Sequence, residues 1–223
     1  MKLKFAILVF PGTNCERDMY YAITDELGQE AEYIRHSESS PNSLDSFDAI
    51  LIPGGSSHGD ALRPGAIASI ANIIPALHKA NEEGKPILGI CNGFQILTEA
   101  GLLPGALLNN QKFICKTTPI KISSNSSIFT SLYETGQVVK YPIAHLSGNY
   151  YCDNATLREL QQNRQILFTY ENNPNGSVAN IAGITNKAGN VLGMMPHPER
   201  VLNKLFGNDD GLPLFKSMIN AIL

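Results

Sequence analysis

The chain has 223 residues, of which 43% are hydrophobic and 17% are charged, and its formal net charge at pH 7 is −3. These values are typical of a globular protein with a substantial core, and no dense cluster of Lys and Arg indicates a surface for nucleic acid or anionic lipid. The length fits one domain, so we expect residues 1–223 to form a single domain.

The apolar run at the N-terminus, residues 5–10, is short and ends at Pro11-Gly12 without the small-residue cleavage site of a signal peptide. No window reaches the ~18 consecutive apolar residues of a membrane span. We therefore expect a cytoplasmic protein that does not bind a membrane.

Strands and helices alternate through the first hundred residues. Near-continuous apolar runs bounded by Gly and Pro predict strands buried on both faces, and amphipathic stretches between them predict helices. In chain order we expect a strand at 3–10, a helix at 14–28, strands at 31–36 and 47–55, a helical stretch at 65–84, a strand at 85–90 and a helix at 92–101. Pro75 should kink or break the helical stretch at 65–84 from within. This alternation is the pattern of a doubly wound α/β fold.

The second half of the chain is richer in strands. We expect them at 112–123, 136–145, 164–170, 178–186 and 190–197, with a short helix at 154–163 and a C-terminal helix at 211–223. The sequence therefore predicts an α/β protein whose mostly parallel central sheet has flanking helices and gains additional strands from the second half.

Four cysteines are scattered along the chain, and they are Cys15, Cys91, Cys115 and Cys152. No pair has the spacing of a zinc site or of a disulfide framework, and His36, His58 and His78 have no ligand partner at metal spacing, so we expect free thiols and no metal. Cys115 and Cys152 fit buried core positions. Cys15 begins a predicted helix, but no base lies near it in the sequence.

Cys91 differs from the other three because it lies in "ILGICNGFQIL", where Gly89-x-Cys91-x-Gly93 joins a predicted strand to a predicted helix. A sharp turn of this form exposes its central side chain above the sheet and needs flanking glycines. The helix N-terminus favours a thiolate, and the N–H of Asn92 points towards the space where an oxyanion would form. The alternative is a buried thiol that only fills space, as most free cysteines do.

A partner for Cys91 is found in "LGMMPHPER", where a predicted strand ends at Pro196-His197-Pro198. The two prolines restrict the backbone around His197, and Glu199 can accept a hydrogen bond from one nitrogen of its ring. The other nitrogen can then face a thiol, which completes a nucleophile, a base and an orienting carboxylate. Taken alone, His197 fits a surface turn residue equally well and Glu199 a solvated acid, but combined with the elbow they predict a Cys-His-Glu triad.

Two further segments can contribute to such a site. Gly54 and Gly55 end a buried strand in "LIPGG", where their backbone N–H groups can complete an oxyanion hole, although an ordinary turn explains them as well. His145 ends another predicted strand, close to Gly148. Its side chain could line a pocket or could have a purely structural role, and the sequence favours neither.

These motifs together resemble the class I (triad) glutamine amidotransferases. Within that class, six segments resemble the glutaminase subunits of phosphoribosylformylglycinamidine synthases, and the most specific of them are "CNGFQ" and "MMPHPER". The resemblance implies that Cys91 is the nucleophile, His197 the general base and Glu199 its orienting partner. It also implies that Gly55 and Asn92 supply oxyanion amides and that Gln95 holds the substrate glutamine.

The resemblance further implies a division of labour between subunits. This chain would hydrolyse glutamine and pass ammonia to a large synthetase subunit, with a small third subunit in some complexes. ATP and magnesium would bind the partner, which converts formylglycinamide ribonucleotide to formylglycinamidine ribonucleotide, and this chain itself would bind no cofactor. The segment "AHLSGNY" departs from the family pattern, because Leu146 and Ser147 stand where we expect a glycine and an acidic residue.

Two alternatives remain open at this point. An α/β cysteine hydrolase or peptidase with the same elbow would cleave peptides and not glutamine. A non-catalytic binding module would hold Cys91 as an inert thiol.

Overall fold

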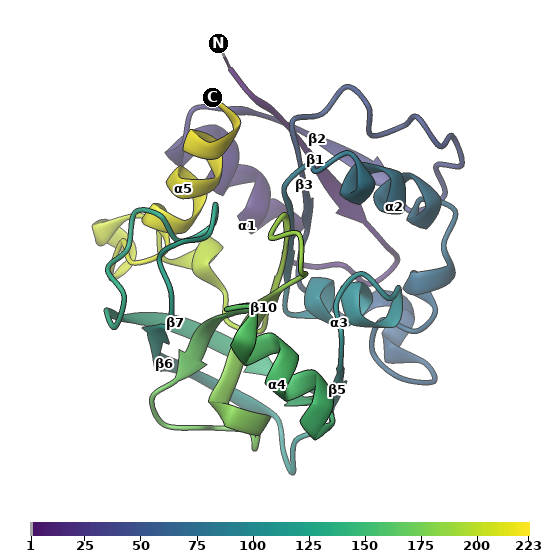
Figure 1. Ribbon diagram of the computed structural model, residues 1–223. Helices are drawn as coiled ribbons and strands as arrows, with labels where there is room; N and C mark the ends of the chain where they lie inside the picture. The colour runs from purple at the N-terminus through teal and green to yellow at the C-terminus, as the bar shows by residue number, and fades with distance from the viewer. Residues whose placement is uncertain (1) are drawn as a thin grey trace.

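A computed structural model describes residues 2–223 and has a nine-stranded sheet at its centre (Figure 1). The strand order is β2-β1-β3-β4-β11-β10-β9-β6-β7. These strands are β1 (Lys4–Val9), β2 (Glu30–Arg35), β3 (Ala49–Ile52), β4 (Ile87–Ile90), β6 (Ile114–Ile122), β7 (Val138–His145), β9 (Ile166–Tyr170), β10 (Ile181–Thr185) and β11 (Val191–Met194). A separate two-stranded sheet pairs β5 (Ala106–Leu108) with β8 (Asn149–Tyr151).

The central sheet has a parallel part and an antiparallel part. Strands β2, β1, β3, β4 and β11 pair in parallel, whereas β10, β9, β6 and β7 add on antiparallel. Of the nine strands, β10 and β6 run against the others. Every residue of β3, β4 and β11 is buried, as expected for strands covered on both faces. The predicted fold class is confirmed.

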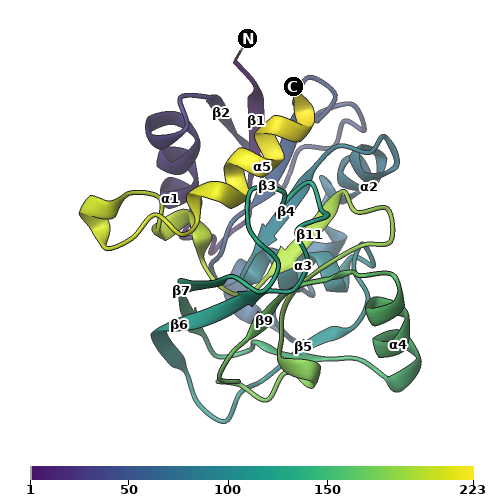
Figure 2. The same cartoon turned by 60° about the vertical axis from the view of Figure 1, so that its left-hand side comes forward.

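Helices cover both faces of the parallel part (Figures 1 and 2). Figure 1 shows α1 and α5 on one side of β1 and β3, and α2 and α3 on the other. The helices are α1 (Glu16–Tyr21), which continues as a π-helical turn η1 (Ala22–Glu26), α2 (Ile74–Glu82), α3 (Asn92–Glu99), α4 (Asn154–Gln162) and α5 (Leu212–Ile222). No helix of residues 2–223 is long and apolar enough to cross a membrane.

The predicted helical stretch at 65–84 is divided, and Pro75 is the reason. Residues before it form turns and a short 3₁₀ helix, η3 (Ala68–Ile70), and α2 begins only at Ile74 with Pro75 in its first turn. Proline is tolerated there because the first N–H groups of a helix have no intrahelical partner. Pro75 therefore starts a helix and does not kink one.

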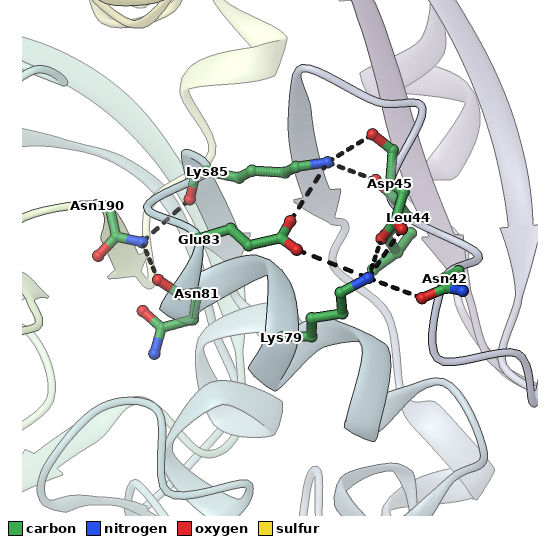
Figure 3. Close-up of polar contacts among 8 residues, drawn as sticks. All are labelled: Asn42, Leu44, Asp45, Lys79, Asn81, Glu83, Lys85 and Asn190. Carbon is green, nitrogen blue, oxygen red and sulfur yellow. Dashed lines mark hydrogen bonds and ion pairs between the residues drawn. The ribbon is translucent and has the colours of Figure 1, made fainter.

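A set of ion pairs and hydrogen bonds lies at the edge of the sheet where the parallel strands begin (Figure 3). Lys79 on α2 binds both Asp45 oxygens at 2.7 and 2.8 Å and the Asn42 side chain at 2.7 Å. Lys85 donates to the carbonyls of Leu44 and Asp45. Asn190, just before β11, donates to the carbonyls of Asn81 and Lys85. These contacts tie α2 to the segments that lead into β3, β4 and β11, and we call them the amino-edge network.

The opposite edge gathers the predicted site. Strands β3, β4 and β11 are adjacent and parallel, so their carboxyl ends meet at one edge. There β3 leads into Gly54, β4 into Cys91 and β11 towards His197. Strand β7 runs in the same direction and ends at His145. Sheet topology thus brings together motifs that lie more than a hundred residues apart in the sequence.

Candidate active site

Cys91 occupies a strained turn between β4 and α3. Its backbone has φ 53° and ψ −105°, a conformation that side-chain-bearing residues rarely adopt and that strain-bearing functional sites often contain. The N–H of Cys91 donates to the Met194 carbonyl of β11 at 2.8 Å, and its carbonyl accepts from Phe94 and Gln95. These bonds hold the turn from both sides of the sulfur-bearing residue.

Gly93 is required because the elbow presses against β3. A Cβ at this position would lie 2.0 Å from the carbonyl oxygen of Ile52, which is backbone and cannot move aside cheaply. The elbow therefore brings α3 closer to the sheet than any side chain at residue 93 would permit. Cys91 itself is 5% exposed and lies at the N-terminus of α3.

His197 and Glu199 form a buried pair just beyond β11. The His197 Nδ1 lies 2.6 Å from the Glu199 Oε1, and the two side chains are 2% and 0% exposed. The N–H of His197 donates to the Pro142 carbonyl of β7, which fixes the backbone beneath the ring. Within residues 2–223, no hydrogen-bond partner reaches the buried Nε2 of His197. Glu199 thus orients the ring and leaves its second nitrogen free.

The protonation of His197 follows from its neighbours. Burial disfavours a charged ring, but the Glu199 carboxylate and Cys91 outweigh that effect and raise the pKa of His197 from 6.5 to about 10. The pair can therefore hold a proton on the imidazole, as a base must after it takes one from a thiol.

Gly54 lies between the elbow and the histidine. A Cβ built on Gly54 would lie 2.9 Å from the Cε1 of His197 and 3.3 Å from the Cβ of Cys91. Both side chains therefore flank the same glycine, and its missing side chain leaves the space between them. The structure brings Cys91, His197 and Glu199 together, and it places Gly54 at the centre of the group.

Gly55 and Asn92 bring backbone N–H groups to this edge. Gly55 forms a bridge with Thr13 whose hydrogen bonds run from Asn14 N–H to Gly54 and from Ser56 N–H to Gly12. The N–H of Gly55 takes no part in that bridge, which leaves it available to a ligand. Asn92 is the first residue of α3, where N–H groups have no intrahelical acceptor. Both are suited to bind an oxyanion.

Gln95 connects the elbow helix to the loop after β7. Its amide nitrogen donates to the Ser147 carbonyl at 2.6 Å, and its amide oxygen accepts from the Asn92 side chain at 2.8 Å. The Ser147 hydroxyl in turn donates to Asn109 at 2.6 Å. Gln95 therefore holds the "LSG" segment in place with neutral groups, at the point where the sequence departs from the family pattern.

His145 lies buried at the end of β7. Asn110 contacts its Nδ1 at 3.0 Å and its carbonyl at 3.1 Å, whereas its Nε2 is buried without a partner among the described residues. Burial, with the charge of His197 added, lowers the pKa of His145 from 6.5 to about 4. The ring is neutral at pH 7 and close enough to the triad to affect its electrostatics.

Two residues beside the triad were not anticipated from the sequence. The Cys15 thiol lies 3.1 Å from the Arg200 guanidinium, and Arg200 also bonds Asp18 at 3.1 Å and lies 3.9 Å from Glu199. Arg200 follows Glu199 directly in the sequence, but Cys15 is 182 residues before His197 and only the fold brings it close to the triad.

The prediction that Cys115 is a core thiol is wrong, since it is exposed near the start of β6.

Comparison with known proteins gives a consistent result. Residues 2–211 match the model of the CobB/CobQ-like glutamine amidotransferase domain. One chain of the PurLQS structure from Thermotoga maritima is 42% identical, with full coverage of both chains and a TM-score of 0.90. A proposed GMP synthase component from Thermoplasma acidophilum (14% identity, coverage 100% and 94%, TM-score 0.68) shares the fold. So does a glutamine amidotransferase from T. maritima (14%, coverage 100% and 98%, TM-score 0.60).

Proposed function

Because this chain belongs to the CobB/CobQ-like glutamine amidotransferase family, we propose that it is the glutaminase subunit of a phosphoribosylformylglycinamidine synthase. The observation that carries the proposal is the 42% identity to a PurLQS chain over the full length of both chains. The buried Cys91, His197 and Glu199 group at the carboxyl edge of the sheet supports the same activity independently.

Cys91 is the nucleophile in this proposal. Its sulfur attacks the side-chain amide carbon of glutamine after His197 takes the thiol proton through the free Nε2. The Glu199 carboxylate, at 2.6 Å from Nδ1, stabilises the imidazolium that results. A sulfur–carbon bond forms, and the amide carbonyl becomes an oxyanion.

Ammonia leaves in the next step. His197 returns its proton to the amide nitrogen as the carbon–nitrogen bond breaks, and a thioester remains on Cys91. Water then attacks the thioester, with His197 again accepting a proton, and glutamate and the free thiol are released. The amides of Gly55 and Asn92 stabilise the oxyanion in both halves of the reaction, and Gly54 provides the space between sulfur and ring.

Glutamine is expected to lie between the elbow and the loop after β7. Gln95, Ser147 and His145 border that region, and Gln95 already uses both ends of its amide on protein groups. We therefore propose that Gln95 contributes mainly by holding the loop, and that direct contacts with the substrate come in part from the loop backbone.

The product ammonia is proposed to pass to a large synthetase subunit, and a small third subunit is the further partner proposed. ATP and magnesium are assigned to the large partner, and no cofactor is assigned to this chain. The cytoplasm, where purine synthesis requires these subunits to meet, is the proposed location.

The test is to combine the chain with its synthetase partner, ATP and formylglycinamide ribonucleotide, and to supply either glutamine or ammonium. We expect Cys91→Ala to abolish product formation from glutamine and to retain it from ammonium, while Cys115→Ala, a change at an exposed thiol, retains both. Glutamine-dependent synthesis by the Cys91→Ala complex would refute the assignment. So would an unmodified chain that adds no glutamine-dependent activity to the synthetase.

A further inference from the structure

The side chain of Asn92 is buried beside the elbow, and the proposed mechanism uses only the backbone N–H of this residue. The residue is 1% exposed, and both ends of its amide have partners. Its Oδ1 accepts from the N–H of Ser57 at 3.1 Å, and its Nδ2 donates to the Oε1 of Gln95 at 2.8 Å. Because the Ser57 N–H can only donate, the orientation of the Asn92 amide is determined. The bond to Ser57 joins the elbow to the segment that contains Gly55.

The segment that contains Gly55, residues 54–57, has hydrogen bonds on two sides. On one side, three backbone hydrogen bonds of 2.9 to 3.2 Å join it to residues 12–15. On the other side, one hydrogen bond joins it to residues 91–95 within the described part of the chain, and the acceptor of that bond is the Asn92 side chain. The position of Gly55 relative to the elbow therefore depends on a single side chain.

The loop that begins at Ser57 is strained. His58 and Asp60 have φ values of 52° and 55°, which residues with side chains rarely adopt. Three buried atoms of this loop, the Ser57 Oγ, the His58 Nε2 and the Asp60 Oδ1, also have no hydrogen-bond partner in the part of the chain that the structure describes. Strained backbone conformations persist only where surrounding contacts fix them. The bond from Ser57 to Asn92 is such a contact, and it lies two residues after Gly55.

An oxyanion hole stabilises charge only when its donors converge on one point. The N–H of Gly55 comes from the segment after β3 and that of Asn92 from the first turn of α3, so the two donors belong to different elements. Such donors lie about 2.7–3.1 Å from the oxyanion, and a misplacement of about 1 Å can lower a rate by about 10²-fold. A hydrogen bond that joins the two elements beside the donors therefore affects the chemical step.

The other end of the Asn92 amide contacts the opposite wall of the site through Gln95. The Gln95 Oε1 accepts the bond from Asn92, whereas its Nε2 donates to the Ser147 carbonyl at 2.6 Å. Loss of the Asn92 amide leaves the bond from Gln95 to Ser147 in place. The loop after β7, where glutamine is proposed to bind, therefore keeps this contact, and a change at Asn92 should alter kcat more than KM.

We propose that the side chain of Asn92 is a positioning residue for glutamine hydrolysis. Through Ser57 it fixes the N–H of Gly55 relative to the elbow, so that the N–H groups of Gly55 and Asn92 face the same oxyanion. The inference rests on the proposed function, because the oxyanion forms only when Cys91 attacks an amide carbonyl. Asn92 then has two roles, since its backbone supplies one donor and its side chain sets the position of the other.

The kinetic test uses Asn92→Leu in the complex with the synthetase. Leucine has a similar volume and keeps the backbone N–H, but it cannot accept a bond from Ser57. We expect kcat for glutamine hydrolysis to fall by about 10–10²-fold, with KM changed by less than about 3-fold. The control Asn190→Leu removes another buried amide, at the amino edge, and should leave kcat within about 2-fold. Unchanged kcat in Asn92→Leu, or an equal loss in Asn190→Leu, overturns the proposal.

Alkylation of Cys91 separates an effect on the oxyanion donors from an effect on the sulfur. Iodoacetamide forms a sulfur–carbon bond with release of iodide, and no oxyanion arises in that reaction. The alkylation rate in Asn92→Leu should therefore stay within about 2-fold of the rate in the unmodified chain. If alkylation slows as much as hydrolysis, the side chain acts on the sulfur and the proposal is wrong. Asn92→Ala, which also cannot accept from Ser57, provides the same test if leucine prevents folding.

The hydrogen bond itself can be tested without any activity, by amide hydrogen exchange read by NMR. The N–H of Ser57 should exchange more than about 10-fold faster in Asn92→Leu than in the unmodified chain, and Asn190→Leu should not change its exchange rate. Equal exchange at Ser57 in Asn92→Leu and in the unmodified chain overturns the proposal. An unmodified chain that hydrolyses no glutamine in the complex refutes the proposed function instead, and the exchange result is unaffected by it.

Discussion

The two edges of the parallel sheet carry polar groups of opposite character. In the amino-edge network, Lys79 and Lys85 are partly exposed, and both lysines contact oxygens at 2.7 to 2.9 Å (Figure 3). At the carboxyl edge, His197 and Glu199 are buried, and each keeps an atom that no other described residue contacts by a hydrogen bond. Satisfied polar groups at a surface hold segments together, whereas buried groups with free atoms are available for chemistry.

Shape alone does not distinguish the two edges. A hollow of about 660 Å³ lies at the amino edge, lined in part by Asp45, Asn81, Lys85 and Asn190, and it exceeds the hollow of about 590 Å³ beside Glu199. What differs is the chemistry of the walls. The amino-edge hollow is lined by no thiol or imidazole of the described residues, while the other adjoins the triad.

The comparison predicts its largest effect at His197. His197→Ala should lower the rate of glutamine hydrolysis by about 10⁴–10⁶-fold, close to the effect of losing Cys91, because nucleophile and base act as a unit. The matched change His78→Ala, on α2 and away from this edge, should leave the rate within about 2-fold. Steady-state release of glutamate measures the rate of both variants. If His78→Ala lowers the rate as much as His197→Ala does, the catalytic groups are not confined to the carboxyl edge.

Glu199→Gln should have a smaller effect because Glu199 orients the base and takes no proton. We expect kcat to fall by about 10²–10⁴-fold with little change in KM. Glu83 is a carboxylate at the amino edge that lies 3.6 Å from Lys79 and 3.8 Å from Lys85, and the matched change Glu83→Gln should leave kcat unaltered. If both variants retain full kcat, Glu199 has no role in orienting His197.

The buried His197–Glu199 pair at the carboxyl edge should also make the free energy of unfolding depend on pH. The folded pKa of His197, about 10, lies above the unfolded value near 6.5, so its stabilisation is fully present below pH 6.5 and is lost as pH rises towards 10. Glu199→Gln removes the largest contribution that raises this pKa, while burial still lowers it and Cys91 still raises it, so the loss of stability with rising pH should become smaller. Urea denaturation between about pH 6 and 10 measures the difference. If the free energy of unfolding depends on pH in the same way in the unmodified chain and in Glu199→Gln, then Glu199 does not raise the pKa of His197.

The smallest effect is expected at Lys79. Its pairs with Asp45 and Glu83 are exposed to solvent, where screening and side-chain entropy offset most of the attraction. Lys79→Ala should lower Tm by no more than about 3 °C and leave glutamine hydrolysis unchanged. A large loss of activity would show that the amino edge is coupled to the site after all.

The triad was predictable from the sequence because two local patterns carry it. Gly89-x-Cys91-x-Gly93 signals a strand-to-helix turn, and His197-Pro198-Glu199 places a carboxylate two residues from a base. The strands that bring them together were also predictable, since fully buried parallel strands form continuous apolar runs. Both signals depend on residues close in the chain.

Features that depend on contacts across the fold could not be predicted. The proximity of Cys15 to His197 follows from the position of β1 beside β3, and the bond from Gln95 to Ser147 joins residues 52 positions apart. Strands β5 and β8 are too short, at three residues each, to show a period. The burial of Cys115 was predicted wrongly, because a short apolar segment near the edge of a sheet has the same sequence pattern as one in the interior of the sheet.

The most direct measurement is to treat the chain with a glutamine-like electrophile and to locate the adduct by mass spectrometry. We predict an adduct on Cys91 that forms faster than any reaction at the exposed Cys115 and that free glutamine suppresses. Modification of Cys15 or Cys115 in preference to Cys91, or labelling of Cys91 that glutamine does not slow, would contradict it.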